Sequence, residues 1–194
     1  MRARGWRTGA LVLALGACAR LPPLISPPVP GVAVRRTALP DYVEIVGPQR
    51  QHAPPFLGVK GTNFFVLRSW LDRRTGQATT QLYVSDSYRG PERIWNAAYD
   101  PAGAALPFIA IGRDRITCKG DCSWTEEFAA EIPERELDAA ARGLAVTFAA
   151  RSGLRKTIAV TPRQIRLQRA AIAAVRLTIP AYDPSLRSQL TIPG

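Results

Sequence analysis

Histidine, methionine, cysteine and lysine are all scarce in this sequence of 194 residues, which contains one histidine, one methionine, three cysteines and three lysines. Because His52 has no second histidine and no cysteine near it in the sequence, a zinc site is not expected. Any serine–histidine–aspartate triad would also depend on His52, which lies in a Gln-His-Ala-Pro-Pro segment typical of a solvated loop. We therefore expect neither a metal nor a histidine-based active site.

The sequence also lacks the short motifs that accompany common enzyme chemistry. It has no G-x-S-x-G segment, no glycine-rich phosphate loop that follows a strand and opens a helix, and no internal repeat. No cofactor is expected on these grounds.

The composition is that of a globular, basic protein. Hydrophobic residues make up 46% and charged residues 21%, while 17 prolines and 15 glycines favour strands and turns over long helices. Arginine supplies most of the net charge of +11. Such a charge indicates a GC-rich genome or, alternatively, a dedicated anionic ligand.

The first seventeen residues have the layout of a secretory signal. Arg2, Arg4 and Arg7 precede an uncharged run over residues 8–17, which is too short to cross a bilayer as a permanent helix. The segment Leu15-Gly16-Ala17-Cys18 resembles the lipobox of bacterial lipoproteins: a branched apolar residue, two small residues and a cysteine. This resemblance implies cleavage before Cys18 and lipidation of its thiol, with removal of the three arginines leaving a net charge of about +8. By analogy with that family, Ala19 favours the outer over the inner membrane.

We divide the rest of the chain by composition. Residues 18–40 are rich in proline, which predicts a lipidated N-terminus followed by a semi-rigid spacer. Residues 41–176 are predicted to form the folded domain, and residues 177–194 an irregular C-terminal tail.

Alternating apolar residues separated by turn residues predict a series of hairpins. One strand is expected at Tyr42–Val46, and four pairs follow: 62–71 with 79–85, 92–99 with 104–112, 115–118 with 122–132, and 144–151 with 154–161. Helices are expected over 133–142, ended by Gly143, and from the capping box Thr161-Pro-Arg-Gln164 onward. We therefore predict a mainly β protein, an antiparallel sheet or sandwich built from hairpins with about two short helices; the alternative is an α+β fold.

With Cys18 taken by lipid, Cys118 and Cys122 remain as an even pair. Because the periplasm is oxidising, we expect a structural disulfide between them. A redox-active dithiol is the alternative, although the C-x-x-C spacing and the helix start that it normally shows are lacking.

Two further groups of residues are candidates for binding or catalysis. Arg166, Arg169 and Arg176 fall on one face of the second helix, which predicts either a solvated face or a site for an anion such as lipid phosphate. A carboxylate pair could act as acid and base, and the candidates are Glu126, Glu127, Asp86, Asp100 and Asp114. Tryptophan and tyrosine residues of the strands are expected to pack in the core or across strands, with an exposed stacking platform as the alternative: Trp70, Tyr83, Tyr88, Trp95, Tyr99 and Trp124.

The leading hypothesis is a lipid-anchored envelope protein that faces the periplasm and binds or supports a partner without catalysis. The alternative is a periplasmic hydrolase that uses a carboxylate pair. The expected partners are the membrane, through the lipid, and an envelope protein or anionic envelope polymer. Nucleic acid does not fit with export.

Overall fold

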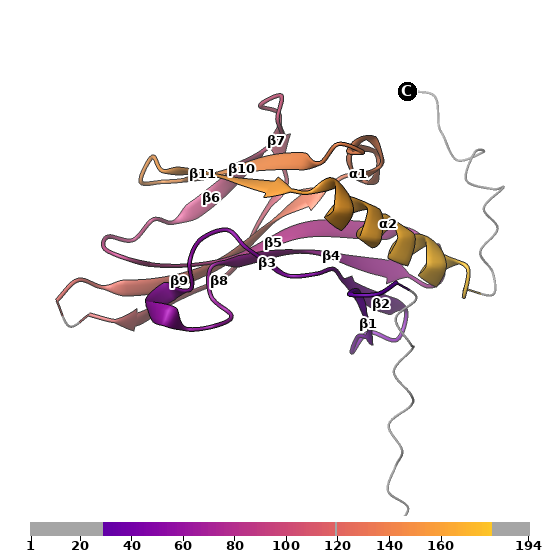
Figure 1. Ribbon diagram of the computed structural model, residues 1–194, viewed down its shortest axis with the longest axis horizontal. Helices are drawn as coiled ribbons and strands as arrows, with labels where there is room; N and C mark the ends of the chain where they lie inside the picture. The colour runs from indigo at the N-terminus through magenta and orange to yellow at the C-terminus, as the bar shows by residue number, and fades with distance from the viewer. Residues whose placement is uncertain (1–28, 119, 180–194) are drawn as a thin grey trace, which may run out of the picture.

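The computed structural model describes residues 29–118 and 120–179. In Figure 1 they form two layers, with a seven-stranded antiparallel sheet below and a four-stranded antiparallel sheet and two α-helices above. The predicted fold class, mainly β and built from antiparallel hairpins, is therefore confirmed, and one of the two helices is short.

The large sheet has the strand order β1-β2-β4-β5-β9-β8, with β3 paired to β4. Alternation along these strands places one set of side chains on the inner face, where Leu82 and Val84 are fully buried. The strands are β1 (Ala33–Arg36), β2 (Tyr42–Val46), β3 (Arg50–Gln51), β4 (Phe64–Asp72), β5 (Ala78–Arg89), β8 (Phe108–Thr117) and β9 (Ser123–Ile132). A single 3₁₀ turn, η1 (Phe56–Gly58), lies between β3 and β4.

The small sheet has the order β11-β10-β6-β7, formed by Arg155–Val160, Leu144–Ala150, Trp95–Tyr99 and Ala105–Leu106. The chain crosses from the small to the large sheet at Pro107, because β7 pairs with β6 whereas β8 pairs with β9. Proline has no N–H to continue the ladder with β6, and its carbonyl accepts a hydrogen bond from Glu131 N at 2.9 Å. Beyond this point β6 and β8 belong to different sheets.

The remaining part of the inner face is covered by α2 (Pro162–Arg176). The helix begins at the predicted capping box of Thr161 and Gln164, with Pro162 at its first turn. Gln168, which is fully buried, donates to the carbonyl of Ile45 at 3.0 Å and to Ser69 Oγ at 2.8 Å, and so fixes α2 to β2 and β4. The core lies between the two layers and includes the edge-on pair Phe128 and Phe148, with ring centroids 4.9 Å apart.

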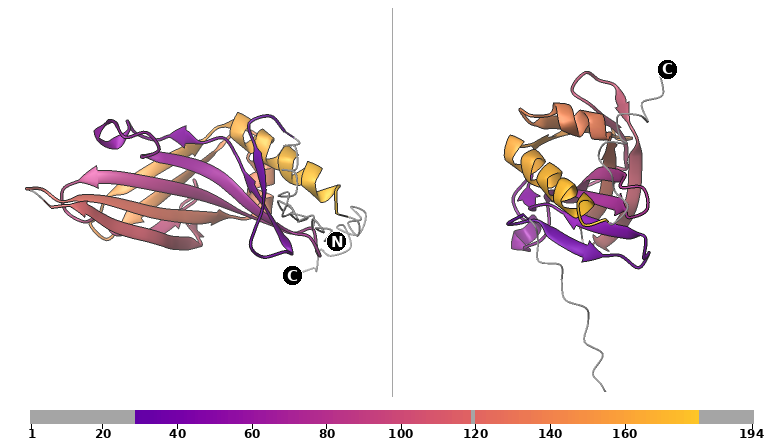
Figure 2. Two further views of the ribbon diagram at one scale, coloured as in Figure 1. Left: turned by 90° about the horizontal axis from the view of Figure 1, so that it is seen from below. Right: turned by 90° about the vertical axis from the view of Figure 1, so that its right-hand side faces the viewer.

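The molecule is elongated, and its two ends differ. Figures 1 and 2 place η1, the β8–β9 turn and the β10–β11 turn at one end of the long axis. The β1–β2 hairpin and the last turn of α2 lie at the opposite end.

The structure corrects the predicted N-terminal boundary of the folded domain. The spacer predicted over residues 18–40 is wrong for its second half, because β1 pairs with β2 and the side chains of Val32 and Val34 are core residues. At the other end, the last helix ends at Arg176, as the predicted boundary has it, and Ile179 beyond it is 7% exposed and still belongs to the core cluster. The signal segment, Cys18 and residues 180–194 lie outside the described residues.

The predicted strands and helices are mostly present with changed lengths. β2 has the predicted bounds, whereas β5 continues to Arg89 and β8 begins at Phe108. The first helix, α1 (Glu134–Ala139), ends before the predicted Arg142, and Gly143 lies in the following turn with a φ of 104°. No helix in the described part of the chain is long and apolar enough to cross a bilayer.

Candidate functional site

Two carboxylates, Asp86 on β5 and Glu126 on β9, are directly opposite each other in the register of these neighbouring strands. They lie on the inner face of the large sheet, with only 1% and 4% of their surfaces exposed. Because a buried charge is costly unless it is paired and hydrogen-bonded, the partners of these two groups define the site.

Asp86 connects the large sheet to the small sheet. Its Oδ1 accepts a hydrogen bond from Lys156 Nζ, on β11. Its Oδ2 accepts from Arg93 Nη1 at 2.9 Å and from the indole Nε1 of Trp95, on β6, at 3.0 Å. The Arg93 guanidinium carbon also lies 3.9 Å from the ring centroid of Tyr88. One aspartate therefore binds two cations and an indole from two other parts of the chain, β11 and the start of β6.

Glu126 holds the turn that precedes β6. Its Oε1 accepts hydrogen bonds from the Tyr88 hydroxyl and from Ile94 N at 3.1 Å, and its Oε2 accepts from Trp95 N at 3.1 Å. Ile94 has a φ of 59°, a left-handed conformation that costs a β-branched residue on the order of 1–3 kcal/mol. Burial, and then the hydrogen bond to Glu126, raise the pKa of Tyr88, so its hydroxyl stays a donor.

His52 reaches the same network from the loop between β3 and β4. Its Nε2 lies 2.9 Å from the carbonyl oxygen of Ser85, and since a carbonyl only accepts, Nε2 carries the proton. Its Nδ1 faces Lys156 Nζ at 3.5 Å. Burial, and then the charge of Lys156, lower the pKa of His52. The predicted solvated loop histidine is wrong, because only 6% of this side chain is exposed.

Every carboxylate oxygen in the network is hydrogen-bonded. All four oxygens of Asp86 and Glu126 accept hydrogen bonds from cationic, indole, hydroxyl or backbone donors. Each carboxylate is therefore engaged by groups of the protein itself, in the acceptor role that an Asp or Glu side chain plays in a structural network. Chemically, this arrangement is suited to fastening the two sheets together rather than to acid–base turnover.

A cleft opens beside this network where β6 and β8 diverge. Its volume is about 400 Å³, and apolar rings from Trp95, Phe108 and Phe128 line it together with the side chain of Glu126. Arg113 and Arg151 are also among its lining residues, and Arg113 pairs with Glu92 at 2.8 Å. β8 is the last strand of the large sheet, and β6 pairs with β7 only at Ala98 and Tyr99. The cleft is thus bounded by two strands that do not pair with each other.

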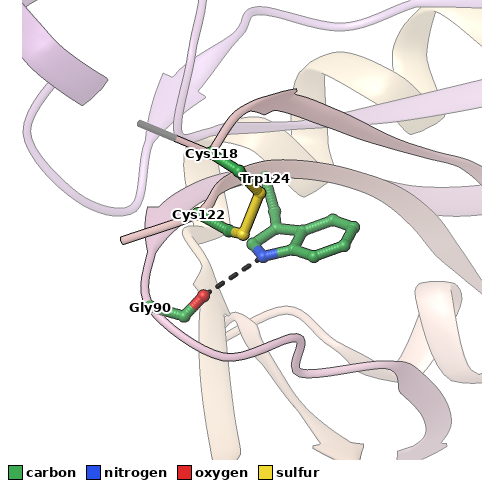
Figure 3. Close-up of a disulfide and its surroundings, with 4 residues drawn as sticks. All are labelled: Gly90, Cys118, Cys122 and Trp124. Atoms are coloured by element: carbon green, nitrogen blue, oxygen red, sulfur yellow. Dashed lines mark hydrogen bonds between the residues drawn. A yellow bond between two sulfur atoms is a disulfide. The ribbon is translucent and has the colours of Figure 1, made fainter. Parts of the chain in front are cut away.

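Cys118 and Cys122 lie at the turn between β8 and β9, with their sulfur atoms 1.99 Å apart, as the predicted disulfide requires. Figure 3 shows the indole of Trp124 beside this pair, with its Nε1 donating to the carbonyl oxygen of Gly90 at 3.1 Å. Gly90 N in turn donates to the carbonyl oxygen of Cys122 at 2.9 Å. The pair therefore lies in a hydrogen-bonded turn at the end of the same β5–β9 ladder that carries Asp86 and Glu126, and these hydrogen bonds involve neither carboxylate.

The three arginines of α2 do not form one exposed face. Arg176 is 7% exposed, with its Nη2 2.8 Å from Glu134 Oε1 and its Nε donating to the carbonyl oxygen of Gly76 at 2.6 Å. Arg169 pairs with Asp138 on α1 at 2.9 Å. Arg166 is exposed. An anion would therefore have to compete with existing ion pairs at two of the three positions.

The other predicted carboxylates do not join the Asp86–Glu126 network. Glu127 follows Glu126 on β9 and is also among the residues that line the cleft, but alternation turns its side chain to the opposite face of the sheet, beside Tyr83. Asp100 accepts a hydrogen bond from Ala104 N in the β6–β7 turn, and Asp114 is exposed on β8. Within the described residues, no group of three or more histidine, cysteine, aspartate or glutamate side chains could hold a metal ion.

Sequence reasoning had named both carboxylates but not their pairing, and it had missed Lys156 and Arg93. The alternation of β5 and β9 could have shown that Asp86 and Glu126 point inward, in phase with Val84 and Phe128.

Comparison of the chain with protein-family models, with curated proteins and with solved structures found no match.

Proposed function

We propose that this chain is a lipoprotein of the bacterial cell envelope, anchored through Cys18, whose β-rich domain binds an envelope component in the cleft between β6 and β8 without catalysis. The observation that carries the binding role is the cleft itself. It has an apolar lining, polar side chains around it and a rigid network behind it, as ligand sites commonly do. The lipid anchor rests on the lipobox of Leu15 to Cys18.

The hydrogen bonds that both carboxylates already make support a binding role over the hydrolase alternative. Glu126 lines the cleft and lies opposite Asp86, which is the arrangement that a hydrolase would use. Each of its oxygens, however, already accepts a hydrogen bond from the chain. A substrate that used Glu126 would have to compete with the donors that hold the Ile94 turn.

The cleft is tested by photo-crosslinking in intact cells. A photoreactive residue in place of Asn96, which is exposed and lines the cleft, should give a discrete crosslinked product. The same residue in place of Ala102, exposed in the β6–β7 turn, serves as the control and should not. Equal patterns at the two positions would remove the cleft as the binding site.

The anchor is tested separately by metabolic labelling with a fatty acid. Cys18→Ser should abolish incorporation of label and release the protein from the membrane fraction, because a serine hydroxyl cannot form the thioether. The double variant Cys118→Ser/Cys122→Ser should retain the label. Labelling of the Cys18→Ser protein would refute the anchor and leave the cleft proposal standing.

A further inference from the structure

Exposed apolar side chains are concentrated at the end of the molecule that carries η1, the β8–β9 turn and the β10–β11 turn, which we call the loop end (Figures 1 and 2). Seven large hydrophobic side chains are exposed among the described residues. One of them, Ile111, lines the cleft, and two lie at the opposite end of the molecule, Leu39 and Leu177. The other four lie on three separate segments of the loop end: Leu57 (67% exposed), Val59 (56%), Ile116 (54%) and Leu154 (48%).

The loop containing Leu57 and Val59 is held in place by hydrogen bonds. Thr62 Oγ1 accepts from Phe56 N at 2.8 Å and donates to the carbonyl of Val59 at 2.7 Å. Leu57 itself has a φ of 51°, which is a strained conformation for a branched side chain. The chain therefore accepts a conformational cost while it presents these two apolar side chains to solvent.

The same end is rich in positive charge. Among the described residues of the loop end, the exposed acidic side chains are Asp114 and Asp121. The exposed basic side chains on the loops and strand ends there outnumber them: Lys60, Arg89, Arg113, Arg115, Arg151 and Arg155. Separate apolar tips surrounded by basic residues are the pattern of a surface that contacts anionic lipid.

We propose that the loop end binds the surface of an anionic phospholipid bilayer, with Leu57 and Val59 entering the boundary between headgroups and acyl chains. A fluid bilayer adapts to apolar tips on three separate segments, whereas a protein pocket would require them to form one contiguous patch. The arginines and Lys60 bind the lipid phosphates. Leu57, Val59 and Lys60 lie outside the cleft, so this contact needs neither a ligand there nor a lipid at Cys18, although Arg113 and Arg151 also line the cleft and Arg113 pairs with Glu92.

The experiment uses the full chain with Cys18→Ser, so that one introduced cysteine can carry an environment-sensitive fluorophore. Leu57→Cys is the test position, and Leu39→Cys and Leu177→Cys are matched controls of similar exposure at the opposite end. Each labelled protein is added to vesicles of phosphatidylethanolamine and phosphatidylglycerol, or of phosphatidylcholine alone. The apolar segment over residues 8–17 also favours vesicles, so the comparison between label positions carries the result.

With anionic vesicles, the emission of the label at position 57 should shift to shorter wavelength and be quenched by a lipid-attached quencher, while the labels at 39 and 177 remain unchanged. No shift at position 57, or the same shift at all three positions, would overturn the proposal. Unchanged circular dichroism spectra verify that each variant is folded.

A charge variant supplies a second readout. With the label at position 57, Lys60→Ala and Arg115→Ala should each raise the anionic lipid concentration needed for half of the emission shift by roughly fivefold. Each basic residue near an anionic surface increases the membrane affinity by about that factor. Arg35→Ala and Arg36→Ala, exposed on β1 at the opposite end, should leave it unchanged. Equal effects of the two pairs would also contradict the proposal.

Discussion

Asp86→Asn is the substitution that most directly probes how the two sheets are held together. The change is nearly isosteric, but it removes the charge that faces Lys156 and Arg93. It also turns an amide nitrogen, which is a donor, toward groups that are themselves donors. Loss of one partner from a buried ion pair commonly costs about 3–5 kcal/mol.

The side chains of Lys156 and Arg93 remain 21% and 26% exposed, so water can partly solvate them after the substitution. We therefore expect a smaller loss of unfolding free energy, about 2–4 kcal/mol. In a chain of this size each kcal/mol lowers the Tm by about 2–4 °C, so the expected fall is roughly 4–16 °C.

The assay is urea denaturation of the purified full chain, followed by tryptophan fluorescence and circular dichroism. Asp138→Asn is the matched control, since Asp138 pairs with Arg169 at 2.9 Å but is 45% exposed. Exposed pairs of this kind contribute at most about 1 kcal/mol. If Asp86→Asn were no more destabilising than Asp138→Asn, the buried network would not be what fastens the sheets.

Three further predictions concern other parts of the chain. Gly47→Ala should lower the unfolding free energy by about 1–3 kcal/mol in the same denaturation assay, because a Cβ there would lie 2.8 Å from Gln168 Oε1 and 3.2 Å from the carbonyl oxygen of Leu67. Gly112→Ala is the control and should lower it far less, because the nearest atom to its Cβ would be 3.8 Å away. Because burial and the charge of Lys156 lower the pKa of His52 in the fold, the unfolded chain binds the proton first as the pH falls below about 6.5. The unfolding free energy should therefore decline below that pH, by at most about 1.4 kcal/mol per pH unit, until the folded chain also binds the proton. His52→Gln should remove this component, and identical pH profiles of the two proteins would show that it does not exist. Mass spectrometry of the exported protein should find Cys118 joined to Cys122, and reduction should cost about 2 kcal/mol or less, because the closed loop is short; free thiols in the exported protein would contradict the structural disulfide.

The hairpins were predictable because the signals that form them are local. Alternation along β10 and β11 and the turn at Ser152 and Gly153 lie within a few residues of each other, and the structure pairs these strands as expected. The capping box at Thr161 and Gln164 is equally local.

The failures came from long-range contacts and from composition. The prolines around β1 suggested a spacer, although the alternation of Val32 and Val34 already indicated a strand with one buried face. The burial of His52 depends on Ser85 and on Lys156, which is 104 residues away in the sequence, and nothing near position 52 shows this. For the same reason, the pairing of Arg176 with Glu134 was not visible from the helical pattern of α2.

Occupancy of the cleft in the intact envelope tests the central proposal most directly. A cysteine in place of Ile111, which lines the cleft, and one in place of Ala102, which is exposed away from it, are labelled with a thiol reagent in cells and in the purified protein. If the cleft binds an envelope component, Ile111→Cys should react more slowly in cells than in the purified protein, while Ala102→Cys reacts equally in both. Equal rates in cells and in the purified protein at both positions would show an empty cleft and contradict the proposed binding function.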